Sequence, residues 1–140
     1  MVLAGPKSFK NNNTLTIDND WLSQSNSKNY HHFFPRAYMK REQPLIPESI
    51  VNHIANITIV DSYLNKSEIK DKAPAKYMDV YRQENPLLPS TMETHLIGDL
   101  EDFGVWSNNY SVFFKKRILT IAQALAAEMV LTEQDIADKL

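Results

Sequence analysis

The pattern of apolar and polar positions predicts two short strands in an otherwise mostly helical chain. Aromatic side chains gather at 29–34, and Pro35 should end a strand there because proline has no backbone N–H for a ladder. Residues 57–60 give the strongest strand signal, since three of the four are β-branched aliphatics. These two runs predict one two-stranded hairpin within a mainly helical α+β domain.

Helical periodicity accounts for most of the remaining chain. Segments 48–53 and 74–83 are predicted helices, each with a proline at or next to its start. Apolar residues at three- and four-residue steps predict the longest helix at 109–129, and a capping pair predicts a short last helix at 132–139. The basic run 115–117 is expected on the polar, outward face of the longest helix.

Residues 1–28 are polar and rich in asparagine and serine. We expect a mostly irregular lead-in with one short element near Trp21. The predicted domain then spans residues 29–140, and a length of 140 residues suits a single domain or a domain of a longer protein.

Composition excludes several classes of site. The chain has no cysteine, so disulfides and thiolate zinc sites are ruled out, and a metal would need imidazole, carboxylate, amide or water ligands. No apolar run approaches the roughly 18 residues that suggest a membrane-spanning helix, and the first residues do not have the pattern of a signal peptide. We therefore expect a cytoplasmic protein with no membrane partner.

Charge is distributed unevenly along the chain. Residues 28–76 carry eight Lys/Arg and five Asp/Glu, which is 8 − 5 = +3, whereas residues 77–140 carry five and ten, which is 5 − 10 = −5. Contact with nucleic acid is expected in the first segment, although ordinary scatter of surface charge produces an excess of this size. The candidate DNA-binding residues in that segment are Arg36, Lys40, Arg41, Lys66, Lys70 and Lys72.

Two histidines and two asparagines carry the chemistry that the sequence suggests. A hairpin followed by a helix would bring His31 or His32 near Asn65, which suits metal-assisted hydrolysis of a phosphodiester. A neutral histidine can take a proton from the attacking water. On residue types alone, a His-His pair is more often structural or exposed than catalytic, and Asn56 before a strand is more often a turn residue.

The ordered set of motifs resembles the HNH endonuclease motif, in the variant of the C-terminal nuclease domain of GmrSD-type restriction endonucleases. Its members here are His31-His32-Phe33-Phe34-Pro35, Asn56-Ile57-Thr58-Ile59-Val60, Leu64-Asn65-Lys66-Ser67 and Pro74-Ala75-Lys76-Tyr77. The resemblance implies a ββα-metal fold in which His32 is the general base. It also implies His31 and Asn65 as metal ligands and Asn56 as the asparagine that holds the loop between the strands.

Two features depart from that family's pattern. His31 stands where many relatives have aspartate, so the site carries less negative charge for Mg²⁺. One divalent cation is expected, Mg²⁺ or Mn²⁺, and the histidine makes Ni²⁺ or Zn²⁺ alternatives. In addition, 24 positions separate His32 from Asn56, which is a long insertion for this motif.

The resemblance implies a metal-dependent endonuclease that hydrolyses DNA, as the nuclease part of a restriction or defence protein. Its partner would be an N-terminal nucleotide-hydrolysing domain, and the chain itself contains no GxxxxGK[ST] phosphate loop. The alternatives are a nucleic-acid-binding module that has lost catalysis and a helical interaction module.

Overall fold

The computed structural model describes residues 5–15, 30–61 and 63–139, with side chains to Met129 in the last helix. The element predicted near Trp21 lies outside these residues. None of the described helices combines the length and the apolar character needed to cross a membrane.

The predicted hairpin is confirmed. Strand β1 (Tyr30–His32) pairs antiparallel with strand β2 (Ile57–Ile59), in a register that places Tyr30 opposite Ile59 and His32 opposite Ile57. A two-stranded hairpin is only marginally stable alone in water, so it depends on packing against the helices around it.

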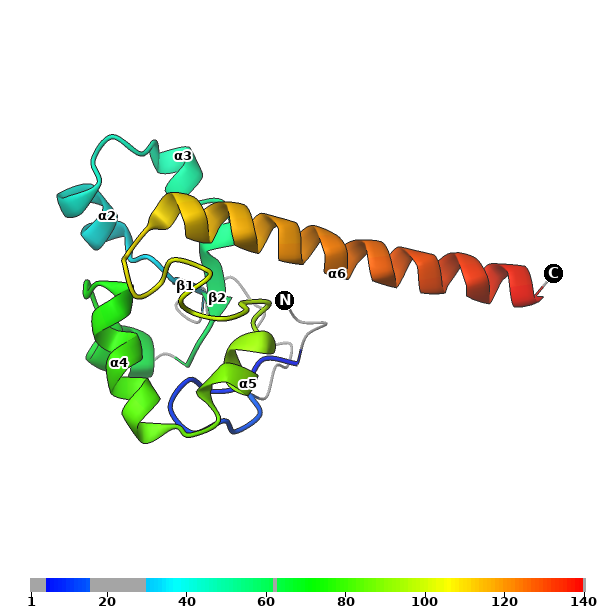
Figure 1. The fold of residues 1–140 in the computed structure, drawn as a ribbon, viewed down its shortest axis with the longest axis horizontal. Helices are drawn as coiled ribbons and strands as arrows, with labels where there is room; N and C mark the ends of the chain where they lie inside the picture. Colours follow the sequence, from blue (N-terminus) through cyan, green and yellow to red (C-terminus); the bar gives the residue numbers. More distant parts are fainter. Residues whose placement is uncertain (1–4, 16–29, 62, 140) are drawn as a thin grey trace.

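The long insertion between the two strands forms a small helical unit. It contains α2 (Arg36–Glu42), α3 (Glu48–Val51) and the 3₁₀ turn η3 (Ile54–Asn56), and Figure 1 shows α2 and α3 together on one side of the molecule. The helix predicted at 48–53 therefore ends earlier than expected. It ends because Asn52 already departs from helical geometry and the chain must turn into β2.

Four helices follow the hairpin in the part of the chain that the structure describes. They are η4 (Leu64–Ile69), which has π-helical hydrogen bonding, α4 (Pro74–Glu84), α5 (Leu88–Glu93) and α6 (Tyr110–Lys139). The helix predicted at 74–83 is confirmed as α4.

Helix α6 is one continuous helix of 30 residues, so the predicted break between 129 and 132 is wrong. The sequence has no proline or glycine from 109 to 139, and a good capping pair alone does not interrupt a helix that its residues can continue. Its second half extends away from the body of the molecule, where Leu125 and Met129 are exposed (Figure 1).

Aromatic side chains from distant segments make the core. Phe33 stacks on Phe113 of α6, with ring centroids 4.8 Å apart and planes at 8°. Phe9 is fully buried and packs edge-on against Phe33 at 6.2 Å. A bridge between Lys7 and Thr14 closes the loop that carries Phe9. Residues 5–15 are thus part of the packed structure.

Arg117 corrects the expectation that the basic run 115–117 faces outward. Lys115 and Lys116 are exposed, but Arg117 is fully buried. Its guanidinium donates to the carbonyl oxygens of Ala55 (2.9 Å), Ile57 (2.7 Å) and His95 (3.0 Å). Arg117 faces inward because it lies one turn after Phe113, on the face of α6 that covers the hairpin.

Candidate functional site

His31 is a buried histidine in which one ring nitrogen is hydrogen-bonded and the other has no hydrogen-bond partner among the described residues. Its Nδ1 lies 3.2 Å from Thr58 Oγ1, and the Thr58 hydroxyl donates to the His31 carbonyl oxygen at 3.3 Å. Because that hydroxyl proton is already used, Thr58 Oγ1 accepts the proton of Nδ1. The Nε2 atom therefore carries a lone pair, and it has no hydrogen-bond partner among the described residues.

Burial keeps His31 neutral. Burial is the main cause that lowers the pKa of His31 to about 3, and the nearby His32 and His95 contribute to the same shift. A neutral imidazole that donates from one nitrogen and leaves the other open has the arrangement common to metal-binding histidines. The ring of Tyr77 also packs edge-on against it, with centroids 5.9 Å apart.

His32 is only partly buried, as expected for the neighbour of an inward-facing strand residue. Its Nε2 lies 3.0 Å from Asn52 Oδ1, so Nε2 carries the proton and Nδ1 is the nitrogen that can accept one. Partial burial and the charge of Arg36 lower the pKa of His32, while the bond to Asn52 acts in the opposite direction. His32 is thus neutral at pH 7 and suited to accept a proton.

Asn56 joins three segments of the hairpin and its insertion. Its Oδ1 accepts from the Phe34 backbone N–H at 2.8 Å, and its Nδ2 donates to the carbonyls of Phe34 (3.0 Å) and Val51 (2.9 Å). The side chain is fully buried, so water cannot replace these bonds. The loop after β1 is therefore fixed to α3 and to the start of β2.

We predict that Asn56→Ala lowers the free energy of unfolding by about 2–4 kcal/mol, because buried backbone groups of Phe34 and Val51 lose their partners. Asn56→Asp should cost at least as much, since it keeps the shape but turns a carboxylate oxygen toward two carbonyls. Urea denaturation measures both. A loss below 1 kcal/mol in both variants would contradict the role given to Asn56.

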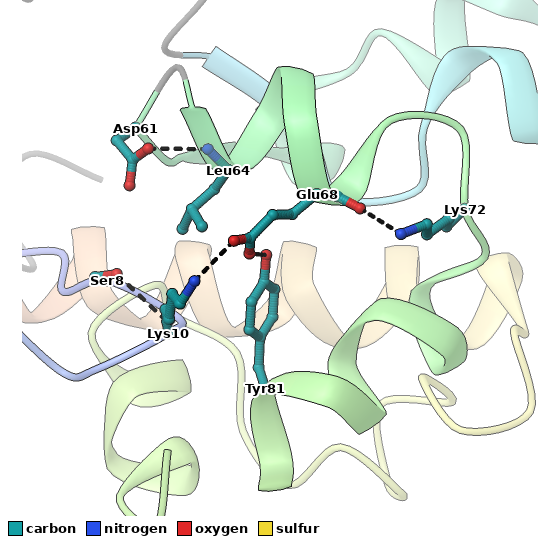
Figure 2. Close-up of polar contacts among 7 residues, drawn as sticks. All are labelled: Ser8, Lys10, Asp61, Leu64, Glu68, Lys72 and Tyr81. Carbon is teal, nitrogen blue, oxygen red and sulfur yellow. Dashed lines mark hydrogen bonds and ion pairs between the residues drawn. The ribbon is translucent and has the colours of Figure 1, made fainter. Parts of the chain in front are cut away.

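Asn65 lies in the first turn of η4 and is partly buried. The start of η4 is fixed by Asp61, whose Oδ1 accepts from the Leu64 backbone N–H at 2.9 Å. The middle is fixed by Glu68, which contacts Lys10 Nζ and the Tyr81 hydroxyl, both at 2.8 Å (Figure 2). These contacts tie the helix that carries Asn65 to the N-terminal loop and to α4.

The structure does not join the three motif residues directly. No hydrogen bond of the described residues links His31, His32 and Asn65. The described part of the chain also holds no group of three or more His, Cys, Asp or Glu side chains placed for a metal ion. A cation here would thus rely on one imidazole, one amide oxygen and water. The imidazole atom without a hydrogen-bond partner is His31 Nε2, and it is buried from solvent.

The six candidate DNA-binding residues differ in their surroundings. Arg36 pairs with Glu48 at 2.5 Å, Arg41 pairs with Glu42 and Asp71, and Lys72 donates to the Glu68 carbonyl. The other three side chains are exposed on the surface, and they are Lys40, Lys66 and Lys70.

Thr58 and Asn52 were not singled out by the sequence, although they determine the hydrogen bonding of the two histidines. Thr58 is opposite His31 in the hairpin register, and Asn52 comes from the insertion. The sequence carries no signal for these roles, because the role of Thr58 depends on how the strands pair and that of Asn52 on how the insertion folds back.

The chain matches no family model, no curated protein and no solved structure.

Proposed function

We propose that this chain is a metal-dependent DNA endonuclease domain of the HNH type, resembling the nuclease domain of GmrSD-type restriction endonucleases. The observation that supports the proposal most is the set of three hydrogen bonds made by the Asn56 side chain. These bonds fix the loop after His32, which is the task of the middle asparagine in the HNH motif. The hairpin register and the neutral, partly exposed His32 support it further.

In this proposal each motif residue has a separate task. His32 accepts a proton from the attacking water through Nδ1, while Asn52 holds its ring from the other side. His31 Nε2 and the amide oxygen of Asn65 would hold one divalent cation, Mg²⁺ or Mn²⁺. When bound, the cation would neutralise charge on the phosphate and stabilise the leaving oxygen.

A plasmid assay combined with calorimetry tests this function. The parent chain should nick supercoiled DNA with Mg²⁺ or Mn²⁺ and should bind the metal in the absence of DNA. Asn65→Ala should lose most of both properties, because it removes a ligand. Ser67→Ala, an exposed change in the same helix, is the matched control and should retain both. Equal metal binding by the Asn65→Ala variant and the parent would count against the ligand assignment.

The second candidate is a DNA-binding module of the same fold without catalysis. It is favoured by the burial of His31 and by the lack of a carboxylate-rich metal cluster among the described residues. If the chain binds DNA but none of the tested metals produces nicking, the non-catalytic module is the correct function and the enzyme is not. In either case a nucleotide-hydrolysing partner domain and a cytoplasmic location are part of the proposal.

A further inference from the structure

A cavity of about 610 Å³ lies within the insertion that separates the two strands of the hairpin. Its volume is within the range of small-molecule sites in proteins. It is formed by α2, by the loop after it and by α3, and its lining residues include Arg36, Ala37, Met39, Lys40, Ile46, Glu48 and Val51.

The cavity has an apolar interior and a charged mouth. Among its lining residues, Met39 and Val51 are buried and Ile46 is partly buried. Arg36, Lys40 and Glu48 are exposed, so their charged groups lie where the cavity opens to solvent. An apolar ligand group with a nearby negative charge would suit this distribution of residues.

Two of the lining residues connect the cavity to His32. Val51 lines the cavity, and the next residue, Asn52, holds the His32 ring at 3.0 Å. Arg36 lines it as well, and its charge acts on His32. A ligand in the cavity would therefore contact residues that neighbour Asn52 or act on the candidate catalytic histidine.

From this geometry we propose that the cavity binds one nucleobase of DNA next to the phosphate presented to His32, with Arg36 and Lys40 meeting the adjoining phosphates. The proposal rests on the proposed DNA-directed function and names a binding site for it. Contacts with the apolar lining residues would compensate for the base–base stacking that a nucleobase loses when it leaves the DNA stack.

Glu48 gives the cavity a chemical preference. Arg36 bonds to Oε1 of Glu48 at 2.5 Å, which orients the carboxylate and leaves Oε2 as an acceptor at the mouth. Cytosine and adenine offer an exocyclic amino donor to a carboxylate, whereas thymine offers a carbonyl oxygen at the equivalent position. The cavity should therefore prefer cytosine or adenine to thymine.

Nuclear magnetic resonance titrations of the whole chain test the site without requiring cleavage. The probes are deoxycytidine monophosphate, thymidine monophosphate and inorganic phosphate. The cytidine nucleotide should shift amide signals across residues 36–51 at a concentration several-fold lower than the thymidine nucleotide. Phosphate alone should affect only the neighbourhood of Arg36 and Lys40. Equal responses to phosphate and to both nucleotides would overturn the proposal.

Two substitutions to tryptophan provide a matched pair. Ala37→Trp places a large side chain in the cavity from an exposed helix position, and it should weaken binding of the cytidine nucleotide at least tenfold. Ser49→Trp is equally exposed, lies outside the lining and should leave the affinity unchanged. Unchanged affinity in Ala37→Trp would place the nucleotide elsewhere and overturn the proposal.

The nucleotide titration and the plasmid assay can fail separately. Nucleotide shifts on 36–51 without nicking would support the cavity within a non-catalytic module. Nicking without such shifts would support the nuclease function and contradict the proposed nucleobase site.

Discussion

His32→Ala is expected to lose most of the cleavage rate, by a factor of about 10²–10⁴, because general-base catalysis typically contributes that much. Folding and DNA binding should remain nearly intact, since His32 is only partly buried and, in the proposed mechanism, acts in the chemical step. Single-turnover cleavage of a plasmid, with DNA affinity measured separately, checks both parts.

The pH dependence follows from the same residue. A general base must be neutral, and the pKa of His32 lies below the usual value of 6.5 because of burial first and Arg36 second. The rate of the parent should therefore rise with pH on the acid side of 6.5 and level off above it. That rise should be absent from the residual activity of His32→Ala.

One result would reverse the assignment of the histidines. If His32→Ala cut DNA as fast as the parent, while His31→Ala were inactive and still bound metal, His31 would be the base. The alignment of the motif would then be wrong by one residue.

Arg117→Ala is expected to lower the free energy of unfolding by roughly 3–5 kcal/mol. The guanidinium is fully buried, and burial lowers its pKa to about 10, which leaves it charged at pH 7. Its removal would leave the carbonyls of Ala55, Ile57 and His95 without these bonds and would open a hole between α6 and the hairpin. Urea denaturation followed by circular dichroism measures the change.

Lys116→Ala is the matched control for Arg117→Ala. It removes a positive charge from the preceding, exposed position of the same helix, so its effect should stay within about 0.5 kcal/mol. Similar small effects in both variants would show that the contacts of Arg117 do not stabilise the fold.

The sequence predicted the hairpin well because its signal is local. β-branched residues at 57–60 and aromatic residues at 29–34 specify two short strands without reference to the rest of the chain, although β1 ends at His32 and not at Pro35. The resemblance gave Asn56 the task of holding the loop between the strands. Its side chain does bond to Phe34 and Val51, while its place in a nuclease motif stays a prediction.

Tertiary contacts explain what the sequence could not predict. Arg117 has the residue type of a surface position, and only the approach of the hairpin carbonyls makes its burial favourable. The tautomers of His31 and His32 depend on Thr58 and Asn52, which reach them through strand pairing and through the insertion. The roles of Asn65 as ligand and His32 as base stay predictions.

The burial of Phe9 has a consequence for where the chain can be shortened. A truncated chain that began at Tyr30 would contain every residue of the nuclease-like motif. It would nevertheless lack the ring that fills the space between Phe33, Tyr81 and His95. It would also lack Lys10, the cation that binds Glu68 in the helix carrying Asn65. The shortest autonomous folding unit therefore includes the N-terminal loop, although no motif residue lies within it.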